Sequence, residues 1–134
     1  MINLEQIRDV FRQRIFDSGI FTAIQWENQV LDDSAKGGLW MAESYLPLDE
    51  NFSDSTNGNQ LEGIFQYYIN SKLGTSEEDI TSATIQLGNL FNTAEVIETS
   101  DYKISVGTPK RSSQGKLDDA WYTIIVEIDF KAYE

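Results

Sequence analysis

The chain has 134 residues and a mass of 15.2 kDa, which at about 150 residues per domain predicts one domain spanning residues 1–134. It contains no cysteine and no histidine, which excludes disulfides, thiolate or imidazole metal sites, cysteine nucleophiles and Ser-His-Asp triads. Its 10 basic and 22 acidic residues give a formal net charge of −12, which argues against binding to nucleic-acid phosphates or to an anionic membrane surface.

A helix is predicted over residues 3–17, near the start of the chain. Its apolar residues recur at steps of three and four, as one face of a helix requires: Leu4, Ile7, Phe11 and Ile15. Asn3 is a suitable N-cap, and Gly19 is a suitable residue to end the helix. The polar residues between the apolar ones, among them Arg8 and Arg12, are expected on the solvent face.

Two short strands separated by a polar loop are expected next. The β-prone run 21–26 predicts the first strand, and residues 32–38 with their two glycines predict the loop. Residues 39–46 predict the second strand, which Pro47 ends. Residues 48–58 are small, polar and acidic, and a loop of this length is usually functional or mobile.

The middle of the chain predicts a strand followed by a second helix. Alternate residues of the strand fall on one face: Leu61, Gly63, Phe65, Tyr67 and Ile69. Thr75 and Glu78 have the spacing of a capping box, which marks the start of the helix. The helix then carries a stripe of apolar residues: Ile80, Ala83, Leu87 and Leu90.

Three strands and a second long loop complete the expected fold. Residues 94–99 and 102–106 predict a pair of short strands, and residues 107–119 predict a mostly basic loop with Gly, Pro and Ser. The last strand, 122–131, alternates in a strict period of two, so one face is expected in the core and the other against water or a partner. The order α-β-β-β-α-β-β-β predicts an α+β fold, in which two helices pack on one face of an antiparallel or mixed sheet.

Catalytic and metal sites find no support in the sequence. The loop around Gly58 resembles a calcium loop in composition, but its first and twelfth positions would be Ser53 and Ile64, where carboxylates are needed. The acidic pairs at 32–33 and 118–119 each offer one ligand, because adjacent side chains of an extended chain point in opposite directions. We therefore expect no enzyme activity, no metal and no cofactor.

Membrane insertion and secretion are not expected. No apolar run approaches the ~20 residues that a membrane helix needs. The first residues also lack the basic segment followed by an apolar one that is typical of a secretory signal. We therefore expect a protein that is made and kept in a cytoplasm.

The residues that fit an isolated monomer least well suggest an assembly interface. Ile125 has polar neighbours on its face of the last strand, and Ile64 and Tyr68 lie on the strand face opposite the expected core. Such residues are either scattered surface apolar groups, which are common, or part of a subunit contact, where aromatic residues are favoured. The two long loops also differ in charge, which suits head-to-tail or stacked association: one carries Asp49, Glu50 and Asp54, the other Lys110, Arg111 and Lys116.

Several short motifs follow one another along nearly the whole chain: Trp26-Glu27-Asn28, Gly38 to Pro47, Gly63 to Ile69, a turn at Gly74 before an amphipathic helix, and Asp119 to Ala132. In this order they resemble the tail terminator family of long-tailed bacteriophages, that is, the lambda-type tail terminator and its prophage relatives. These motifs are structural, and none of them is catalytic. The turn at 71–75 departs from the family, whose members tend to be richer there in Gly and Pro.

The resemblance implies a subunit of a hexameric ring that caps the tail tube at its final length and offers a docking surface to the head. The partners it implies are further copies of the chain, the tail tube protein and the head–tail connector, with DNA only passing through the ring. It also implies a place in the virion at the head–tail junction, after assembly in the host cytoplasm. Two alternatives stay open: a neck or head-completion connector, and, from a different class, an acidic DNA mimic that inhibits a host enzyme.

Overall fold

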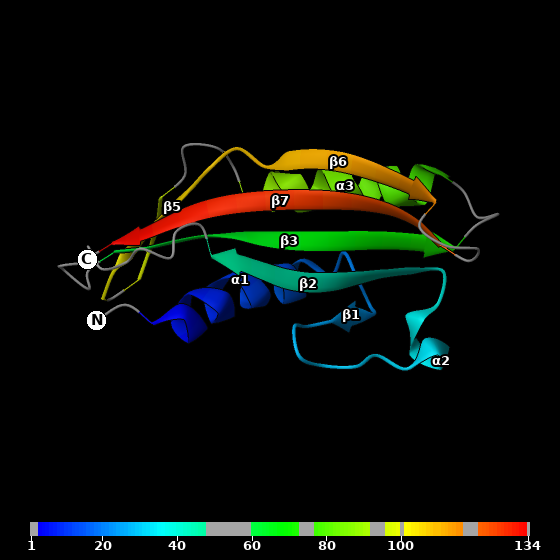
Figure 1. The fold of residues 1–134 in the computed structure, drawn as a ribbon, viewed down its shortest axis with the longest axis horizontal. Helices are drawn as coiled ribbons and strands as arrows, with labels where there is room; N and C mark the ends of the chain where they lie inside the picture. The colour runs from blue at the N-terminus through cyan, green and yellow to red at the C-terminus, as the bar shows by residue number, and fades with distance from the viewer. Residues whose placement is uncertain are drawn as a thin grey trace.

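The computed structural model describes residues 3–47, 60–72, 77–91, 96–99, 101–116 and 121–133. The helices and strands follow one another along the chain (Figure 1) as α1 (Leu4–Ser18), β1 (Ile24–Gln25), α2 (Asp33–Lys36), β2 (Leu39–Pro47), β3 (Gln60–Lys72), α3 (Glu77–Leu90), β4 (Val96–Glu98), β5 (Lys103–Val106), β6 (Lys110–Lys116) and β7 (Trp121–Tyr133). The expected α+β fold is confirmed. The capping residue Thr75 lies outside the described residues.

The strands form one mixed sheet with β3 and β7 at its centre. Its order is β1-β2-β3-β7-β5-β4, and β6 also pairs with β7. β3 and β7 are antiparallel over their whole length, from the pair of Gln60 with Tyr133 to the pair of Lys72 with Trp121. β1 and β2 run parallel, and the other described pairs are antiparallel.

One edge of β7 is shared between two strands. β5 pairs with the C-terminal part of β7, and β6 pairs with its N-terminal part, where Arg111 faces Val126. The expectation of a loop over residues 107–119 is therefore wrong for residues 110–116. The β6 sequence contains no large apolar residue, and its extended conformation follows from pairing with backbone groups that β7 would otherwise leave without partners.

Two expectations for the first half of the chain also need correction. The strand expected over 21–26 is limited to β1, because a turn follows in which the Gln29 N–H donates to the Trp26 carbonyl at 3.0 Å. The polar loop expected over 32–38 contains α2, which is about one helical turn long. The observed order is therefore α-β-α-β-β-α-β-β-β-β.

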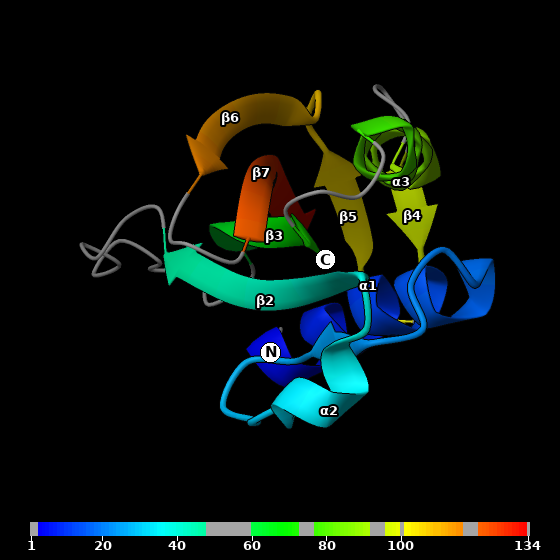
Figure 2. The same cartoon turned by 90° about the vertical axis from the view of Figure 1, so that its right-hand side faces the viewer.

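The two long helices, α1 and α3, cover the same face of the sheet, as expected (Figure 2). Their apolar faces share one core with the sheet, whose most buried residues include Ile7, Phe11, Ile15, Phe65, Tyr67, Ile69, Ile80, Leu87, Phe91, Ile124, Ile128 and Phe130. Phe11 lies at its centre, with ring centroids 4.7 Å from Phe65 and 4.8 Å from Phe91. This core holds both helices against β3 and β7.

Both expected ends of α1 are confirmed. The Asn3 side-chain oxygen accepts a hydrogen bond from the Glu5 N–H at 2.8 Å, which caps the first turn. Gly19 adopts a left-handed conformation with φ of 69°, and its N–H donates to the Phe16 carbonyl at 3.3 Å. These caps fix which residues of α1 face the core.

Candidate assembly interface

The sheet face opposite α1 and α3 is called the outer face here. Ile64 and Tyr68 lie on it and are half-buried, as their position in the strand alternation predicts. Tyr68 lies across from Ala42 on β2 and Ile125 on β7, and its hydroxyl donates to the Gln66 side-chain oxygen at 3.2 Å. Both residues keep surface that a partner can contact.

Ile125 was expected to be an exposed contact residue, and this expectation is wrong. Its side chain is only 7% exposed. Its register partners, Tyr68 on β3 and Ser112 on β6, flank it on both sides, and Figure 2 shows β6 curling over this side of the sheet. Because the residue pattern gives no sign of β6, it also gives no sign that Ile125 is covered.

A hollow of about 500 Å³ lies on the outer face, lined by Asp33, Lys36, Trp40, Ala42, Tyr68, Asn70, Trp121 and Thr123. Trp40 and Trp121 meet edge to face with ring centroids 5.9 Å apart, and the Lys36 ammonium lies 4.4 Å from the centroid of the Trp40 ring. The buried Thr123 hydroxyl donates to the Asn70 side-chain oxygen at 2.6 Å. A shallow hollow with aromatic walls is typical of protein contacts.

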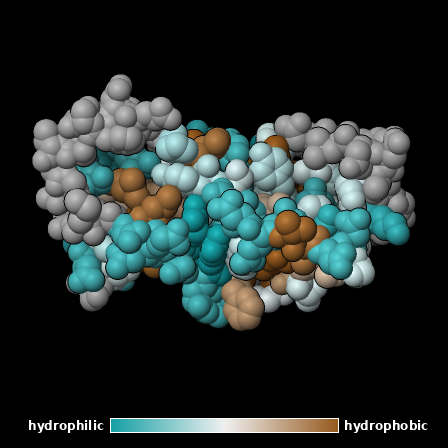
Figure 3. Space-filling view, turned by 60° about the horizontal axis from the view of Figure 1, so that its bottom comes forward, coloured by the Kyte–Doolittle hydropathy of each residue, from teal (hydrophilic) through white to brown (hydrophobic). Residues whose placement is uncertain are grey.

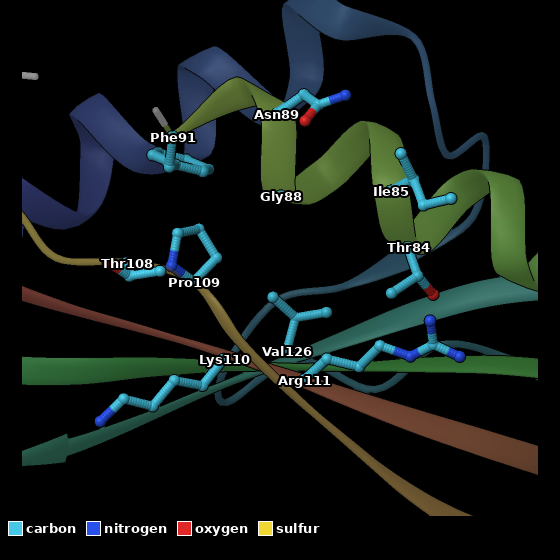
Figure 4. A pocket seen from close by; sticks show the side chains of 10 residues that line it. All are labelled: Thr84, Ile85, Gly88, Asn89, Phe91, Thr108, Pro109, Lys110, Arg111 and Val126. Carbon is cyan, nitrogen blue, oxygen red and sulfur yellow. The ribbon is translucent and has the colours of Figure 1, made fainter. Parts of the chain in front are cut away.

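A groove of about 550 Å³ lies between α3 and β6 (Figure 4), lined by Thr84, Ile85, Gly88, Asn89, Phe91, Thr108, Pro109, Lys110, Arg111 and Val126. Phe91 and Val126 are buried, whereas Ile85 is 54% exposed. Figure 4 shows Pro109 and Val126 pointing towards α3. Gly88 keeps the groove open, because a Cβ at this position would meet only the Pro109 Cβ, at 3.9 Å.

The charged loop residues expected to form an interface are only partly within the described structure. Lys110 and Arg111 lie on β6 with exposed side chains, and both line the groove. Lys116 ends the same strand. The three acidic residues Asp49, Glu50 and Asp54 lie outside the described residues. The expected pairing between acidic and basic segments therefore stays a prediction.

An ionic cluster joins α1 to β2 and to the turn that follows β1, and sequence reasoning missed it. The Glu43 side chain has no exposed surface, and the Arg12 Nε donates to its two carboxylate oxygens at 3.0 and 3.1 Å. The Glu27 N–H donates to the same carboxylate at 3.1 Å. Hydrogen bonding to Glu43 raises the pKa of Arg12, although partial burial acts in the opposite direction. The expectation that Arg8 lies on the solvent face is wrong, since this residue is only 8% exposed.

Glu27, from the Trp26-Glu27-Asn28 motif, connects this cluster to the edge of the sheet. One of its carboxylate oxygens accepts from Arg8 at 3.2 Å, and the other accepts from the Tyr45 backbone N–H at 2.6 Å. That N–H lies on β2 beyond the end of β1, where the strand has an open edge. The nearby Tyr67 hydroxyl is buried without a hydrogen-bond partner among the described residues, and burial raises the pKa of Tyr67 well above its usual value.

The described surfaces have features of sites for protein contacts. In the described part of the chain, no group of three or more acidic residues is arranged to hold a metal ion. Within the same residues, no helix is both long enough and apolar enough to cross a membrane. The aromatic hollow and the cationic groove lie on different faces, so a single subunit presents two distinct surfaces for partners.

Comparison with known proteins shows the fold but not the activity. No protein-family model matches the chain, and no curated protein matches its sequence. One similar solved structure has a TM-score of 0.79 and covers 100% of this chain and 98% of its own. Its sequence is 16% identical, and it carries only a sequence identifier in place of a descriptive name. At this level of identity the likeness establishes a shared architecture over the full chain and nothing further.

Proposed function

We propose that the protein is a phage tail terminator, a virion structural protein that forms a ring on the tail tube and provides the docking surface for the head. The structural observation that carries this proposal is the uneven cover of the sheet. Both long helices lie on one face, while the outer face keeps an aromatic hollow with Trp40 and Trp121. The order of motifs that resembles the tail terminator family supplies the biological context.

The described surfaces suit ring formation. A ring needs two different patches on each subunit, because a head-to-tail contact repeats around a closed circle. The groove beside β6 can serve as one of these patches, and the outer-face hollow leaves a separate surface for the tail tube or the head. The net charge of −12 suits a channel wall as well, since DNA passing along it meets few cations that would retain the phosphates. In this role the protein acts by contact and length control, without a chemical step.

The DNA-mimic alternative draws less support from the described surface. A mimic needs acidic residues in an uninterrupted stripe that resembles a line of phosphates. On this surface, acidic residues alternate with cations that face them: Lys103 lies 3.8 Å from Glu98, and Lys131 lies 3.7 Å from Glu62. The connector alternative uses the same ring architecture, and binding experiments distinguish it from the terminator.

Binding to isolated tail tubes tests the proposal. The purified protein should bind the ends of tail tubes, and the bound ends should then accept heads. A connector would bind heads and not bare tubes, and a DNA mimic would bind neither. Absence of binding to tail tubes under all conditions tried would exclude the terminator function.

The basic residues of β6 should matter for this assembly. Lys110 and Arg111 are exposed. The triple variant Lys110→Glu, Arg111→Glu and Lys116→Glu should therefore give the circular dichroism of the unmodified protein. Exposed charge pairs contribute about 0.2–1 kcal/mol each, so losing three should lower the yield of complete tails. The double variant Lys103→Glu and Lys131→Glu, which changes the net charge from −12 to −16 against −18 for the triple variant, is the control for added negative charge outside β6. Tails of normal number and length from the triple variant would remove the case for these residues.

A further inference from the structure

The groove between α3 and β6 has the features of a binding site for an apolar side chain. Its floor is formed by Phe91 and Val126, which are buried in the core. Ile85 stands on α3 at its rim with 54% of its surface exposed, which is unusual for a large apolar residue on an otherwise polar helix face. Gly88 adds space where any other residue would place a side chain. An apolar group that enters the groove therefore contacts Ile85, Pro109 and the floor together.

The charge of the groove narrows the choice of occupant. Lys110 and Arg111 are exposed on β6, and no ion pair holds either of them within the described residues. The residues that line the groove include no acidic one. The positive charge of this groove contrasts with the net charge of −12 of the whole chain. Its chemistry fits an apolar side chain flanked by carboxylates.

The exposed side of α1 presents this combination. Asp9, Gln13, Phe16 and Asp17 follow one another at helical spacing, so they form one stripe on the side of α1 away from the core. Phe16 is 68% exposed, and Asp17 accepts a hydrogen bond from Gln13 at 2.8 Å. Neither acid forms an ion pair within the described residues. Figure 3 shows the side of the molecule towards α1, where hydrophobic residues form small patches among hydrophilic ones.

We propose that the groove between α3 and β6 binds the α1 stripe of a second copy of this chain, with Phe16 in the groove and Asp9 and Asp17 beside Lys110 and Arg111. The opposite charges and the single apolar anchor of the stripe match the cations and the apolar floor of the groove. This mode is a helix docked into a groove, in which one face of the helix supplies the anchor.

The contact is heterologous, because each subunit offers its stripe to one neighbour and its groove to another. Such contacts form a ring when the rotation between subunits closes. The inference thus rests on the proposed function for its biological setting, since it supplies the lateral contact of the terminator ring. Its physical content, the attachment of α1 to the groove of another copy, is measured on the purified protein without any tail component.

Cross-linking tests the contact directly, because the chain contains no cysteine. Copies with Gln13→Cys, on the stripe, are mixed with copies with Asn89→Cys, on the groove, and treated with a short bis-maleimide at the highest soluble concentration. Heterodimers joined through residues 13 and 89 are expected. Copies with Val30→Cys, which is 95% exposed and lies between β1 and α2 rather than on α1, replace the Gln13→Cys copies as the control. Equal yields from the two mixtures would overturn the proposal.

Anchor removal gives a second measurement. Adding Phe16→Ala to the Gln13→Cys copies removes the apolar anchor without touching the core. Burial of one large apolar side chain corresponds to roughly tenfold to hundredfold in affinity, so the cross-linked yield should fall steeply. An unchanged yield would show that Phe16 does not enter the groove.

Charge reversal on both surfaces distinguishes a direct contact from a loss of folding, because only a direct contact is restored when the two variants are mixed. Copies with Lys110→Glu and Arg111→Glu, and copies with Asp9→Lys and Asp17→Lys, should each self-associate less than the unmodified protein in sedimentation experiments. A mixture of the two should associate again, because each reversed groove then meets a reversed stripe and each unmodified groove meets an unmodified stripe. A mixture that stays dissociated would overturn the proposal. Normal self-association together with no binding to tail tubes would instead count against the proposed function alone.

Discussion

Replacing Arg12 by Ala tests the buried ion pair that fixes α1 against β2. Arg12 donates three hydrogen bonds to the Glu43 carboxylate, whose side chain has no exposed surface. After the substitution, the Glu43 carboxylate keeps the hydrogen bond from the Glu27 N–H at 3.1 Å but loses the three from Arg12. The variant must therefore bury a carboxylate without its cation.

The free energy of unfolding should fall by about 3–4 kcal/mol. Removal of one partner of a buried ion pair costs about 3–5 kcal/mol, and the lower end applies here because the Arg12 side chain is 23% exposed and water can reach its position. The guanidinium also lies 5.2 Å from the centroid of the Trp26 ring, a contact that contributes about 0.5–1 kcal/mol. A surface ion pair would account for less than about 1 kcal/mol.

Urea unfolding followed by tryptophan fluorescence measures this change. The matched variant combines Arg12→Ala with Glu43→Gln, which removes the buried charge but keeps an oxygen that accepts the Glu27 N–H. It should recover most of the lost stability. Lys103→Ala, which removes an exposed ion pair with Glu98, is the surface control and should cost less than about 1 kcal/mol. A loss from Arg12→Ala no larger than that from Lys103→Ala would refute the reasoning.

Three further substitutions test other buried features by urea or thermal unfolding. Tyr67→Phe should leave stability unchanged or raise it by about 1 kcal/mol, because the hydroxyl lacks a described partner. Burial raises the pKa of Tyr67, so this residue ionises more readily in the unfolded chain than in the folded protein. The free energy of unfolding should therefore fall as the pH rises above about 10, the usual pKa of an unfolded tyrosine. The Phe variant should lose less stability over this range, and an equal loss would contradict the burial of the Tyr67 hydroxyl. Gly88→Ala should raise stability by up to about 1 kcal/mol, since its Cβ meets only Pro109 at 3.9 Å, and a decrease would mean that the groove is tighter than it is here. Gly63→Ala should cost about 1–3 kcal/mol, because its Cβ would lie 2.5 Å from a Tyr45 ring atom, and no cost would show that the ring moves freely.

The sequence pattern predicted the central elements well, for physical reasons. α1, β3, α3 and β7 each pack one apolar face against the common core, so their apolar residues recur with the period of the element. β6 has no such signal. Its residues, from Lys110 to Lys116, are polar or small. Its extended conformation depends on pairing with the edge of β7, and the residue pattern of β6 alone does not show this pairing.

The ionic cluster was missed for a different reason. Charged residues are expected on the surface, and Arg8 and Arg12 were placed there although they lie one helical turn apart beside the apolar face of α1. Glu43 carried a usable signal, because it lies between Met41 and Tyr45 in the inward phase of β2. A charged residue in the inward phase of a strand predicts a buried partner of opposite charge. The groove between α3 and β6 gave no comparable signal, because the sequence pattern does not show that these two elements lie side by side.

β7 occupies the centre of the sheet although it follows the other described strands in the sequence. Its partners β3, β5 and β6 are all synthesised before it, and pairs such as Tyr67 with Val126 join distant parts of the sequence. On the ribosome, these earlier strands therefore keep their edges open until residues 121–133 emerge. Pairing over such sequence distances also slows folding, because the chain between must be ordered first. Until β7 emerges, the open edges of β3, β5 and β6 are sites where another chain can pair, so the nascent chain is exposed to aggregation over this interval.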